Sequence, residues 1–206
     1  MHWIEKLLAL IFPSKKDYFN LEMIPKSPHY RGKDDIFSFF DYQSKKGREL
    51  IYYIKKHRDP LLIEKIAAYI YNELLEDFSE KNEFGYFLNP LVIPIPITQK
   101  RHHERGFNQT HNIAKYLSRR VNGHYKHDIL YKTKETKKQA LIPQRHQRKK
   151  NVLGSFAIQD KYKKDIQDQD IIIVDDLYTT GATVNEACRI LLKNKVRNII
   201  VITIAH

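Results

Sequence analysis

The sequence predicts an α/β protein whose central sheet is mostly parallel and is covered by helices on both faces. The continuous aliphatic runs DIIIV (170–174) and NIIVITIA (198–205) are typical of strands that are buried on both sides. Such strands alternate with segments of helical periodicity, which favours parallel strands joined through helices. A length of 206 residues suits one domain, or one domain with a small appendage.

Hydrophobic spacing places the individual elements. Apolar residues three and four positions apart predict helices at 1–12, 47–59, 60–78, 108–120 and 183–194. Short apolar runs predict strands at 35–43, 91–96, 128–131, 152–158, 170–174 and 198–205. The segments 13–35 and 132–151 are predicted loops, and a loop of about 20 residues inside a compact domain is often functional. We therefore divide the chain into an N-terminal helix and loop (1–35) and a main domain (36–206).

Composition restricts the class of protein. A hydrophobic content of 42% with 13 tyrosines indicates a globular chain. Its one cysteine, Cys188, excludes a disulfide framework within the chain and suits a reducing compartment. The first apolar run is short and contains Glu5 and Lys6, so we expect neither a signal peptide nor a membrane span.

The positive charge is concentrated in one segment. Residues 99–150 contain 15 lysines and arginines against three acids, which accounts for the whole net charge of +12. The remainder of the chain has equal numbers of basic and acidic residues. A field focused in this way indicates an anionic partner, either a polyphosphate or a nucleic acid.

The segment IIIVDDLYTTGAT (171–183) combines groups suited to one ligand. The predicted strand brings Asp175 and Asp176 to the carboxyl edge of the sheet, where open α/β sheets bind ligands. The following threonines and Gly181 enter a predicted helix, whose N-terminal N–H groups favour phosphate. Carboxylates suit ribose hydroxyls or Mg²⁺, so a ribose 5-phosphate satisfies every group. Neither a P-loop nor a G-x-G-x-x-G fingerprint is present.

This segment resembles the signature with which type I phosphoribosyltransferases bind phosphoribosyl pyrophosphate (PRPP). The resemblance implies the type I phosphoribosyltransferase fold, with a small N-terminal hood region. It also implies that Asp175 and Asp176 meet the ribose hydroxyls as catalytic residues. The 5-phosphate would then be wrapped by Leu177, Tyr178, Thr179, Thr180, Gly181, Ala182 and Thr183.

Three further segments resemble the ComF family of competence-associated, phosphoribosyltransferase-like proteins. They are PIPITQKRHHERGFNQTHNIAKYL (94–117), KTKETKKQALIPQRHQRKKNVLGSF (132–156) and FDYQSKKGRELIYYIKKHRD (40–59). The resemblance implies a cytoplasmic role in DNA uptake and natural transformation, with a competence DNA helicase as a possible partner. Members commonly carry a cysteine-rich zinc module after an LLxLIFP-like segment. This chain keeps LLALIFP (7–13) without the cysteines, so we expect a degenerate remnant of the module and no zinc.

The resemblance also assigns the leaving-group side of the site. The turn after Ile93 would be the pyrophosphate loop, formed by Pro94, Ile95, Pro96 and Arg101, with Arg105 as a further catalytic candidate. Asn108 is a predicted helix cap. The basic loop would close over the site and offer Lys137, Lys138, Arg145 and Arg148 to the pyrophosphate. We expect Mg²⁺ to be held mainly by PRPP rather than by a metal site of the protein.

Three functions remain open on the sequence. The first is a phosphoribosyltransferase with Mg²⁺ and PRPP, whose acceptor no residue identifies. The second is a catalytically inactive protein that binds PRPP or phosphate and handles single-stranded DNA through its basic segment and interleaved tyrosines. The third is a nucleobase salvage enzyme, against which the segment RGFNQ (105–109) argues.

Overall fold

The computed structural model of the chain describes residues 19–31, 35–81, 89–135 and 145–206. The predicted helix at 1–12 lies outside these ranges. The elements are, in chain order, η1 (Leu21–Met23), β1 (Ile36–Phe40), α2 (Lys45–Lys56), α3 (Pro60–Lys81), β2 (Leu91–Pro94), α4 (Gln99–Arg105), α5 (Gln109–Arg120), β3 (His124–Tyr125), β4 (Leu130–Lys132), α6 (Arg145–Val152), β5 (Phe156–Ile158), η4 (Asp160–Tyr162), β6 (Asp170–Leu177), α7 (Ala182–Lys193) and β7 (Asn198–Ala205).

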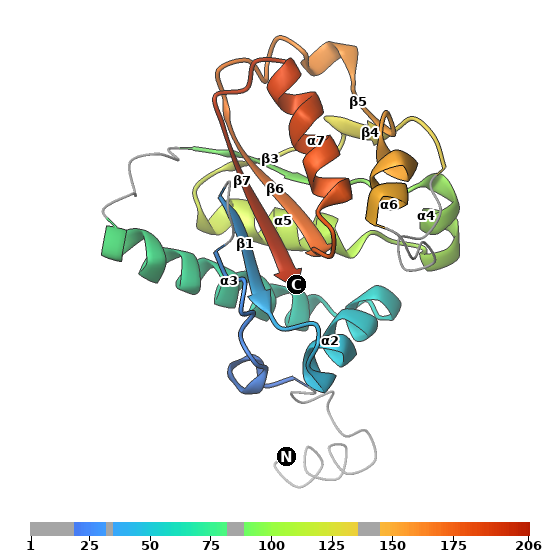
Figure 1. Cartoon of the computed structure of the whole chain (residues 1–206). Coiled ribbons are helices and arrows are strands. Elements are labelled where there is room, and N and C mark those ends of the chain that lie inside the picture. The colour runs from blue at the N-terminus through green and yellow to red at the C-terminus, as the bar shows by residue number, and fades with distance from the viewer. Residues whose placement is uncertain (1–18, 32–34, 82–88, 136–144) are drawn as a thin grey trace, which may run out of the picture.

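Five strands form the central sheet in the order β1-β7-β6-β2-β3, and every pairing in it is parallel (Figure 1). The two long aliphatic strands, β6 and β7, lie in its interior, where both faces are covered. A separate antiparallel pair joins β4 to β5. The predicted parallel α/β sheet is confirmed.

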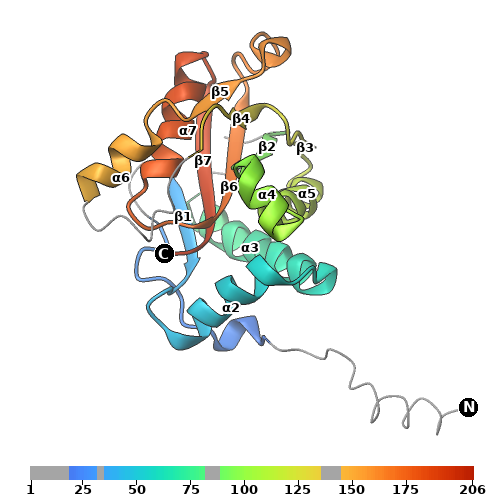
Figure 2. The same cartoon turned by 90° about the vertical axis from the view of Figure 1, so that its right-hand side faces the viewer.

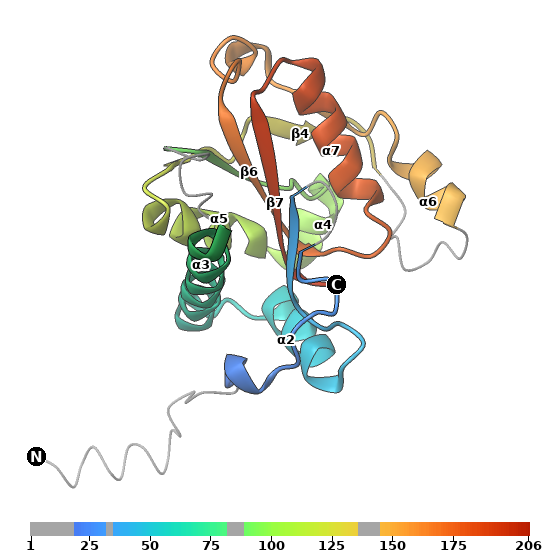
Figure 3. The ribbon, with the colours of Figure 1, turned by 60° about the vertical axis from the view of Figure 1, so that its left-hand side comes forward.

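Helices cover the two faces of the sheet unequally. The helices α3 and α5 lie on one side and α7 lies on the other (Figure 3). On α5, Ile113, Ala114 and Leu117 are buried at helical spacing, and they join the larger core with residues of α2 and α3. On α7, Val184 and Leu191 are buried in a second core, which also takes residues of β4 and β5. The amphipathic spacing of each helix therefore decides which face of the sheet it covers.

The carboxyl ends of the strands point toward α2. The helix α2 lies beyond the tip of β1 in both views (Figures 1 and 2). Ser44 caps its start, because the Ser44 hydroxyl accepts the Gly47 N–H, and the helix buries Leu50, Ile51 and Ile54. A rigidly packed helix thus stands beside the edge of the sheet where a ligand is expected.

The described N-terminal segment 19–31 packs against the main domain. Its Leu21 and Ile24 belong to the larger core. The Tyr30 hydroxyl donates to the carbonyl of Glu73 on α3, and Arg31 pairs with Asp77 at 2.9 Å. The domain boundary at residue 35 stays a prediction.

The structure corrects three details of the expected element order. The predicted loop at 132–151 is wrong at its end, because residues 145–152 form α6, which packs against α7. Arginine, lysine and glutamine are good helix formers, but α6 has almost no apolar residues whose spacing could reveal it. The short elements α4 and β3 were not predicted, and β6 extends beyond 174 to Leu177.

No helix within the described residues is both long enough and apolar enough to span a bilayer.

Candidate functional site

The end of β6 and the start of α7 form a short loop around a small hollow. Asp175 and Asp176 are still part of the strand, and Gly181 precedes the helix with φ +70°. The hollow has a volume of about 10 Å³. Its lining is formed by Asp175, Leu177, Tyr178, Thr179, Thr180, Gly181, Ala182, Thr183 and Val184. The structure therefore brings together the predicted phosphate-binding residues around one concave turn.

Gly181 cannot be replaced without strain in this turn. Its positive φ favours glycine, and a Cβ on it would collide with the Tyr178 hydroxyl. The Gly181 carbonyl accepts the Asn185 N–H at 2.7 Å, which begins α7. The N-cap of α7 provides no side-chain hydrogen bond to the first N–H groups of the helix. This arrangement suits a phosphate at the helix start.

Two aromatic ring contacts lie beside this loop. The Tyr178 ring stacks on His206, with centroids 5.2 Å apart, and His206 contacts the His29 ring at 4.5 Å. The Tyr178 N–H donates to the carbonyl of Ala205, which ties the loop to β7. Burial and the neighbouring His29 lower the pKa of His206. The N-terminal segment is thus linked to the predicted phosphate loop through His29 and His206.

Asp176 is held by residues from two other elements. Lys55 Nζ, from the last turn of α2, lies 3.2 Å from Asp176 Oδ1. The Gln109 amide, at the start of α5, donates to Asp176 Oδ2. Gln109 is itself buried and accepts from Arg105 Nη1 at 3.5 Å. Arg105 is therefore linked to Asp176 through hydrogen bonds that both residues make with Gln109.

Asp175 has a different electrostatic environment. It accepts the N–H of Asp176 at 2.9 Å on Oδ1. Burial and the adjacent Asp176 charge raise the pKa of Asp175 to about 7, against the opposing effects of Lys55 and Lys132. Two neighbouring carboxylates whose surroundings differ in this way are typical of functional sites.

The predicted pyrophosphate loop follows β2, the neighbour of β6. Pro94 and Ile95 are buried, and the Ile95 N–H continues the pairing by donating to the carbonyl of Val174 at 2.8 Å. Pro96 is half-buried. Thr98 then caps α4 by accepting the Arg101 N–H at 3.3 Å. The accessible part of this turn is therefore Pro96 and Ile97, with half-buried Arg101 one helical turn further on.

The RGFNQ segment has a clear structural role. Gly106 ends α4 in the left-handed region, with φ +73°. Asn108 caps α5, as predicted, by accepting the Thr110 N–H at 3.2 Å. Its amide also donates to the carbonyl of Ile95 at 3.1 Å. The segment therefore fixes the predicted pyrophosphate loop and brings Gln109 into contact with Asp176.

Lys132, on β4, is a residue that sequence reasoning missed. Burial and the nearby Arg101 charge lower the pKa of Lys132 to about 8, against the attraction of Asp175. Its ammonium group lies 4.0 Å above the Phe156 ring and 3.3 Å from Ser155 Oγ. Lys132 is one of many lysines in the basic segment, so only the fold distinguishes it from its neighbours.

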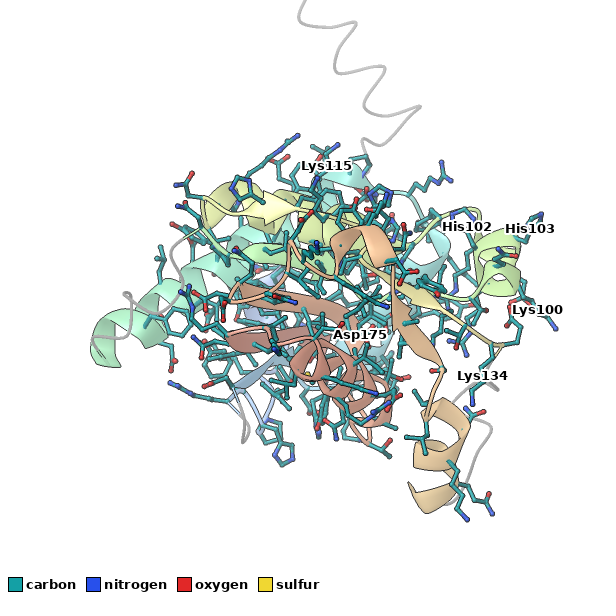
Figure 4. All side chains as sticks on the ribbon, turned by 90° about the horizontal axis from the view of Figure 1, so that it is seen from above. Lys100, His102, His103, Lys115, Lys134 and Asp175 are labelled. Atoms are coloured by element: carbon teal, nitrogen blue, oxygen red, sulfur yellow. The ribbon has the colours of Figure 1, made fainter. Side chains whose placement is uncertain are left out.

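A larger cavity adjoins this lysine. It has a volume of about 530 Å³ and lies between the turn after β2, the start of α5 and β4. The histidines and lysines that line it include His102, His111, His127, Lys132 and Lys134. Burial, followed by His127 and His102, lowers the pKa of His111 to about 4. Figure 4 shows Lys100, His102 and His103 together on α4, with Lys134 on the same side and Asp175 further inside.

The predicted flexible-loop residues are only partly placed. Lys137 and Lys138 lie outside the described residues. Arg145 and Arg148 lie on α6 rather than in a loop, and their side chains are also outside the described part. Their contact with a pyrophosphate stays a prediction.

The donor groups are compatible with Mg²⁺ brought by a ligand. No cluster of three histidine, cysteine or acidic side chains suited to a metal occurs among the described residues. Asp175 and Asp176 nevertheless supply the hard oxygen donors that Mg²⁺ prefers.

The chain is similar in sequence to several known proteins. Residues 109–206 match the family described as phosphoribosyl transferase domain. The chain is 33% identical to DNA utilization protein YhgH of Shigella flexneri over 121 residues, which is 59% of this chain and 51% of that protein. It is 37% identical to competence protein ComFC of Bacillus subtilis over 127 residues, or 61% of this chain and 48% of that protein. It is 30% identical to competence protein F of Haemophilus influenzae over 108 residues, or 52% and 46% of the two chains.

The aligned region thus spans about half the length of these curated relatives. The family match covers Gln109, both aspartates and the whole predicted phosphate loop, whereas Lys55 and Arg105 lie before it. Together with the parallel sheet and the loop after β6, these matches show that the chain is similar to ComF-family proteins and that residues 109–206 belong to a phosphoribosyltransferase domain of type I fold.

Proposed function

We propose that this protein binds PRPP with Mg²⁺ across the carboxyl ends of β2 and β6 and transfers its phosphoribosyl group during DNA uptake in the cytoplasm. One observation carries the proposal. A single turn presents two carboxylates at the end of β6 and, six residues after Asp175, a left-handed glycine that opens α7. A ribose 5-phosphate has hydroxyls for the carboxylates and an anion for the helix start.

Each part of the ligand has a partner in this arrangement. The 5-phosphate would accept hydrogen bonds from the N–H groups of the turn 179–183 and from the hydroxyls of Thr180 and Thr183. The ribose hydroxyls would donate to Asp175 and Asp176. The pyrophosphate would lie toward the turn after β2, where Arg101 and Lys132 concentrate positive charge.

The chemistry requires positioning rather than a covalent nucleophile. As the bond between the anomeric carbon and pyrophosphate breaks, the leaving oxygen takes the electron pair and the acceptor forms the new bond. Arg101 and Lys132 would stabilise the charge that develops on the pyrophosphate. Bound Mg²⁺ would neutralise part of the same charge. Asp175 and Asp176 would hold the sugar in the reactive orientation.

Calorimetric titration with PRPP and Mg²⁺ tests the proposal. We expect binding by the wild type and loss of binding in the variant Asp175→Asn/Asp176→Asn, which preserves side-chain shape. Asp160→Asn is the matched control, because Asp160 is exposed on η4 and pairs with Lys163. Absence of binding to the folded wild type would refute the proposal, and ribose 5-phosphate alone would show whether the loop recognises the phosphate.

A second candidate function is the handling of single-stranded DNA. The exposed side chains of Lys100, His102, His103 and Lys134 gather along α4 and the end of β4, where phosphates could bind. The names of the relatives, which refer to DNA utilization and competence, support this candidate. It predicts affinity that falls steeply with salt and survives Asp175→Asn/Asp176→Asn, which a filter-binding series at several salt concentrations would measure.

A further inference from the structure

The cavity of about 530 Å³ beside β4 is separate from the loop proposed to hold the ribose 5-phosphate. None of the described residues that line it also lines the small hollow after β6. The lining comes from the turn after β2, from α4 and α5, and from segments that follow β3, the strand on the other side of β2 from β6. A volume of this size is typical of small-molecule sites. The cavity can therefore hold a ligand of its own.

The acidic groups of the lining already have partners. Asp128 accepts hydrogen bonds from Lys161 Nζ at 2.8 Å and from the Tyr162 hydroxyl at 2.9 Å. A carboxylate oxygen of Glu135 accepts the Lys100 N–H at 3.2 Å. The other polar side chains of the described lining are amides, hydroxyls, imidazoles and ammonium groups. A ligand in this cavity should therefore be neutral or anionic where it touches the protein.

Aromatic and imidazole rings contribute to the same lining. The His127 ring stacks on Tyr125, with centroids 5.9 Å apart and planes 23° apart. The His111 ring lies 5.5 Å from the His127 ring. Tyr131, on β4, also lines the cavity and is 43% exposed. Rings of this kind are surfaces on which a planar base can stack.

Polar groups beside these rings can recognise the edge of a base. Burial, followed by the neighbouring His127 and His102, lowers the pKa of His111 to about 4, so His111 is neutral at pH 7. A neutral imidazole offers one donor and one acceptor, and the side-chain amides of Gln99 and Gln159 in the lining offer both as well. The edges of bases carry donors and acceptors, whereas a phosphate offers mainly acceptors. The lining therefore fits a base better than a bare phosphate.

Basic residues lie around the cavity. Lys100, His102 and His103 lie together on α4, with Lys134 on the same side (Figure 4). His102 and Lys134 also line the cavity itself. Lys134 Nζ donates to the Leu153 carbonyl at 2.7 Å and keeps further N–H groups for a ligand. Phosphates on either side of a bound base would meet this positive charge.

We propose that this cavity binds one nucleotide unit of single-stranded DNA, with the base among His111, His127 and Tyr131 and the phosphates at Lys134 and α4. A duplex keeps its bases stacked inside the helix, so an unpaired strand presents a base far more readily. A free nucleoside monophosphate has the same chemistry, but the basic residues along α4 favour a strand with several phosphates. The proposal rests on the second candidate function, which it deepens, and is independent of PRPP.

Fluorescence anisotropy with a short labelled oligothymidylate tests the assignment. At constant salt, the Kd of Tyr131→Ala should be about tenfold above the wild-type value, because the base loses a stacking partner. His127→Ala should show a similar loss, and it serves as the second variant if Tyr131→Ala does not fold. Tyr52→Ala and His124→Ala are the controls, because both residues are exposed and neither lines the cavity. An unchanged Kd in Tyr131→Ala and His127→Ala would overturn the proposal.

A strand of the same length without bases separates base recognition from attraction to phosphates. The wild type should bind this abasic strand more weakly than oligothymidylate, and Tyr131→Ala should bind it as the wild type does. Lys134→Met should weaken the binding of both strands and reduce the slope of log Kd against log salt by about one. An equal loss of affinity for both strands in Tyr131→Ala would show that the cavity holds no base and would overturn the proposal.

Competition with free thymidine monophosphate identifies the source of the nucleotide. It should displace the strand only at concentrations about a hundredfold above the Kd of the strand, because it brings a single phosphate. Equal affinity for the free nucleotide would overturn the assignment to a strand. Failure of the wild type to bind either strand would refute DNA handling itself, whereas strand binding that both ring variants retain would refute the cavity alone. Asp175→Asn/Asp176→Asn should bind the strand as the wild type does, so neither result depends on PRPP.

Discussion

Asn108 donates its side-chain amide to the carbonyl of Ile95 at 3.1 Å, and so joins the start of α5 to the turn after β2. The same side chain accepts the Thr110 N–H, while Thr110 Oγ1 lies 3.3 Å from the Ile95 carbonyl. All three residues are buried. One side chain thus caps a helix and fixes the predicted pyrophosphate loop.

Replacing this side chain should destabilise the protein. Asn108→Ala removes the cap and leaves the buried Ile95 carbonyl with fewer donors, so we expect a loss of about 1–2 kcal/mol in the free energy of unfolding. Urea denaturation measures it. Asn185→Ala is the control on the exposed side of α7 and should be nearly neutral. Equal stability of Asn108→Ala and wild type would contradict the assigned cap.

Gly181→Ala should abolish ligand binding at the phosphate loop. The new methyl group would require both a positive φ and displacement of Tyr178, whose hydroxyl occupies its place. The control is Gly154→Ala, because Gly154 also has a positive φ of +67° but has open space beside it. Both variants should lose about 1–2 kcal/mol of stability from the left-handed backbone. Only Gly181→Ala should lose PRPP binding in calorimetry, and retained binding would mean that the loop is not the phosphate site.

Titration of Lys132 should make the stability of the protein depend on pH in the alkaline range. Its pKa is lowered to about 8 in the folded protein, so the unfolded chain binds more protons between that value and the ordinary lysine pKa. Stability conferred by this group therefore rises as pH increases from about 8 to about 10. Denaturation of wild type and Lys132→Met across this range should show a pH-dependent difference. A constant difference would mean that the lysine titrates normally.

Glu186 should contribute stability that disappears in acid. Its buried carboxylate accepts two hydrogen bonds from Arg189 and the N–H of Gly154, and these partners lower its pKa. A lowered pKa gives stability that is present above the ordinary glutamate value and is lost as pH falls through the folded value. Glu186→Gln should cost about 1–2 kcal/mol at pH 7 and progressively less below pH 4.

The exposed Glu49 provides the control for Glu186. It lies 3.9 Å from Lys45 and is largely solvated, so Glu49→Gln should change stability little at any pH. A deficit of Glu186→Gln that is the same at pH 3 and pH 7 would contradict the ionic role of Glu186.

The sequence predicted the sheet and singled out the loop after β6 because both depend on local patterns. The aliphatic runs of β6 and β7 and the segment 175–183 are contiguous, so spacing alone reveals them. It did not predict Lys55 or Lys132 as site residues. Their importance comes from proximity to Asp176 and Asp175, which are more than 40 residues away in the chain. Tertiary packing, which no local pattern encodes, selects these lysines from the many on the surface.

The prediction of the short helices α4 and α6 failed for a different reason. The helix α4 has no buried residue, and α6 has almost no apolar residues, so neither has a hydrophobic period. Capping signals remained available: Thr98 and Gly106 bracket α4 as an N-cap and a left-handed C-cap. They could have been used to predict this helix.

The strand order has a consequence for the folding reaction. The strand β1 pairs with β7, so residues 36–40 find their partners only at 201–205, and β2 likewise pairs with β6. Contacts between segments so distant in sequence raise the contact order and slow folding, because long loops must close first. During synthesis, the N-terminal half would leave the ribosome with its strand edges unpaired until β6 and β7 emerge. Refolding kinetics should therefore be limited by insertion of these two strands into the middle of the sheet, the same step that assembles the candidate ligand site.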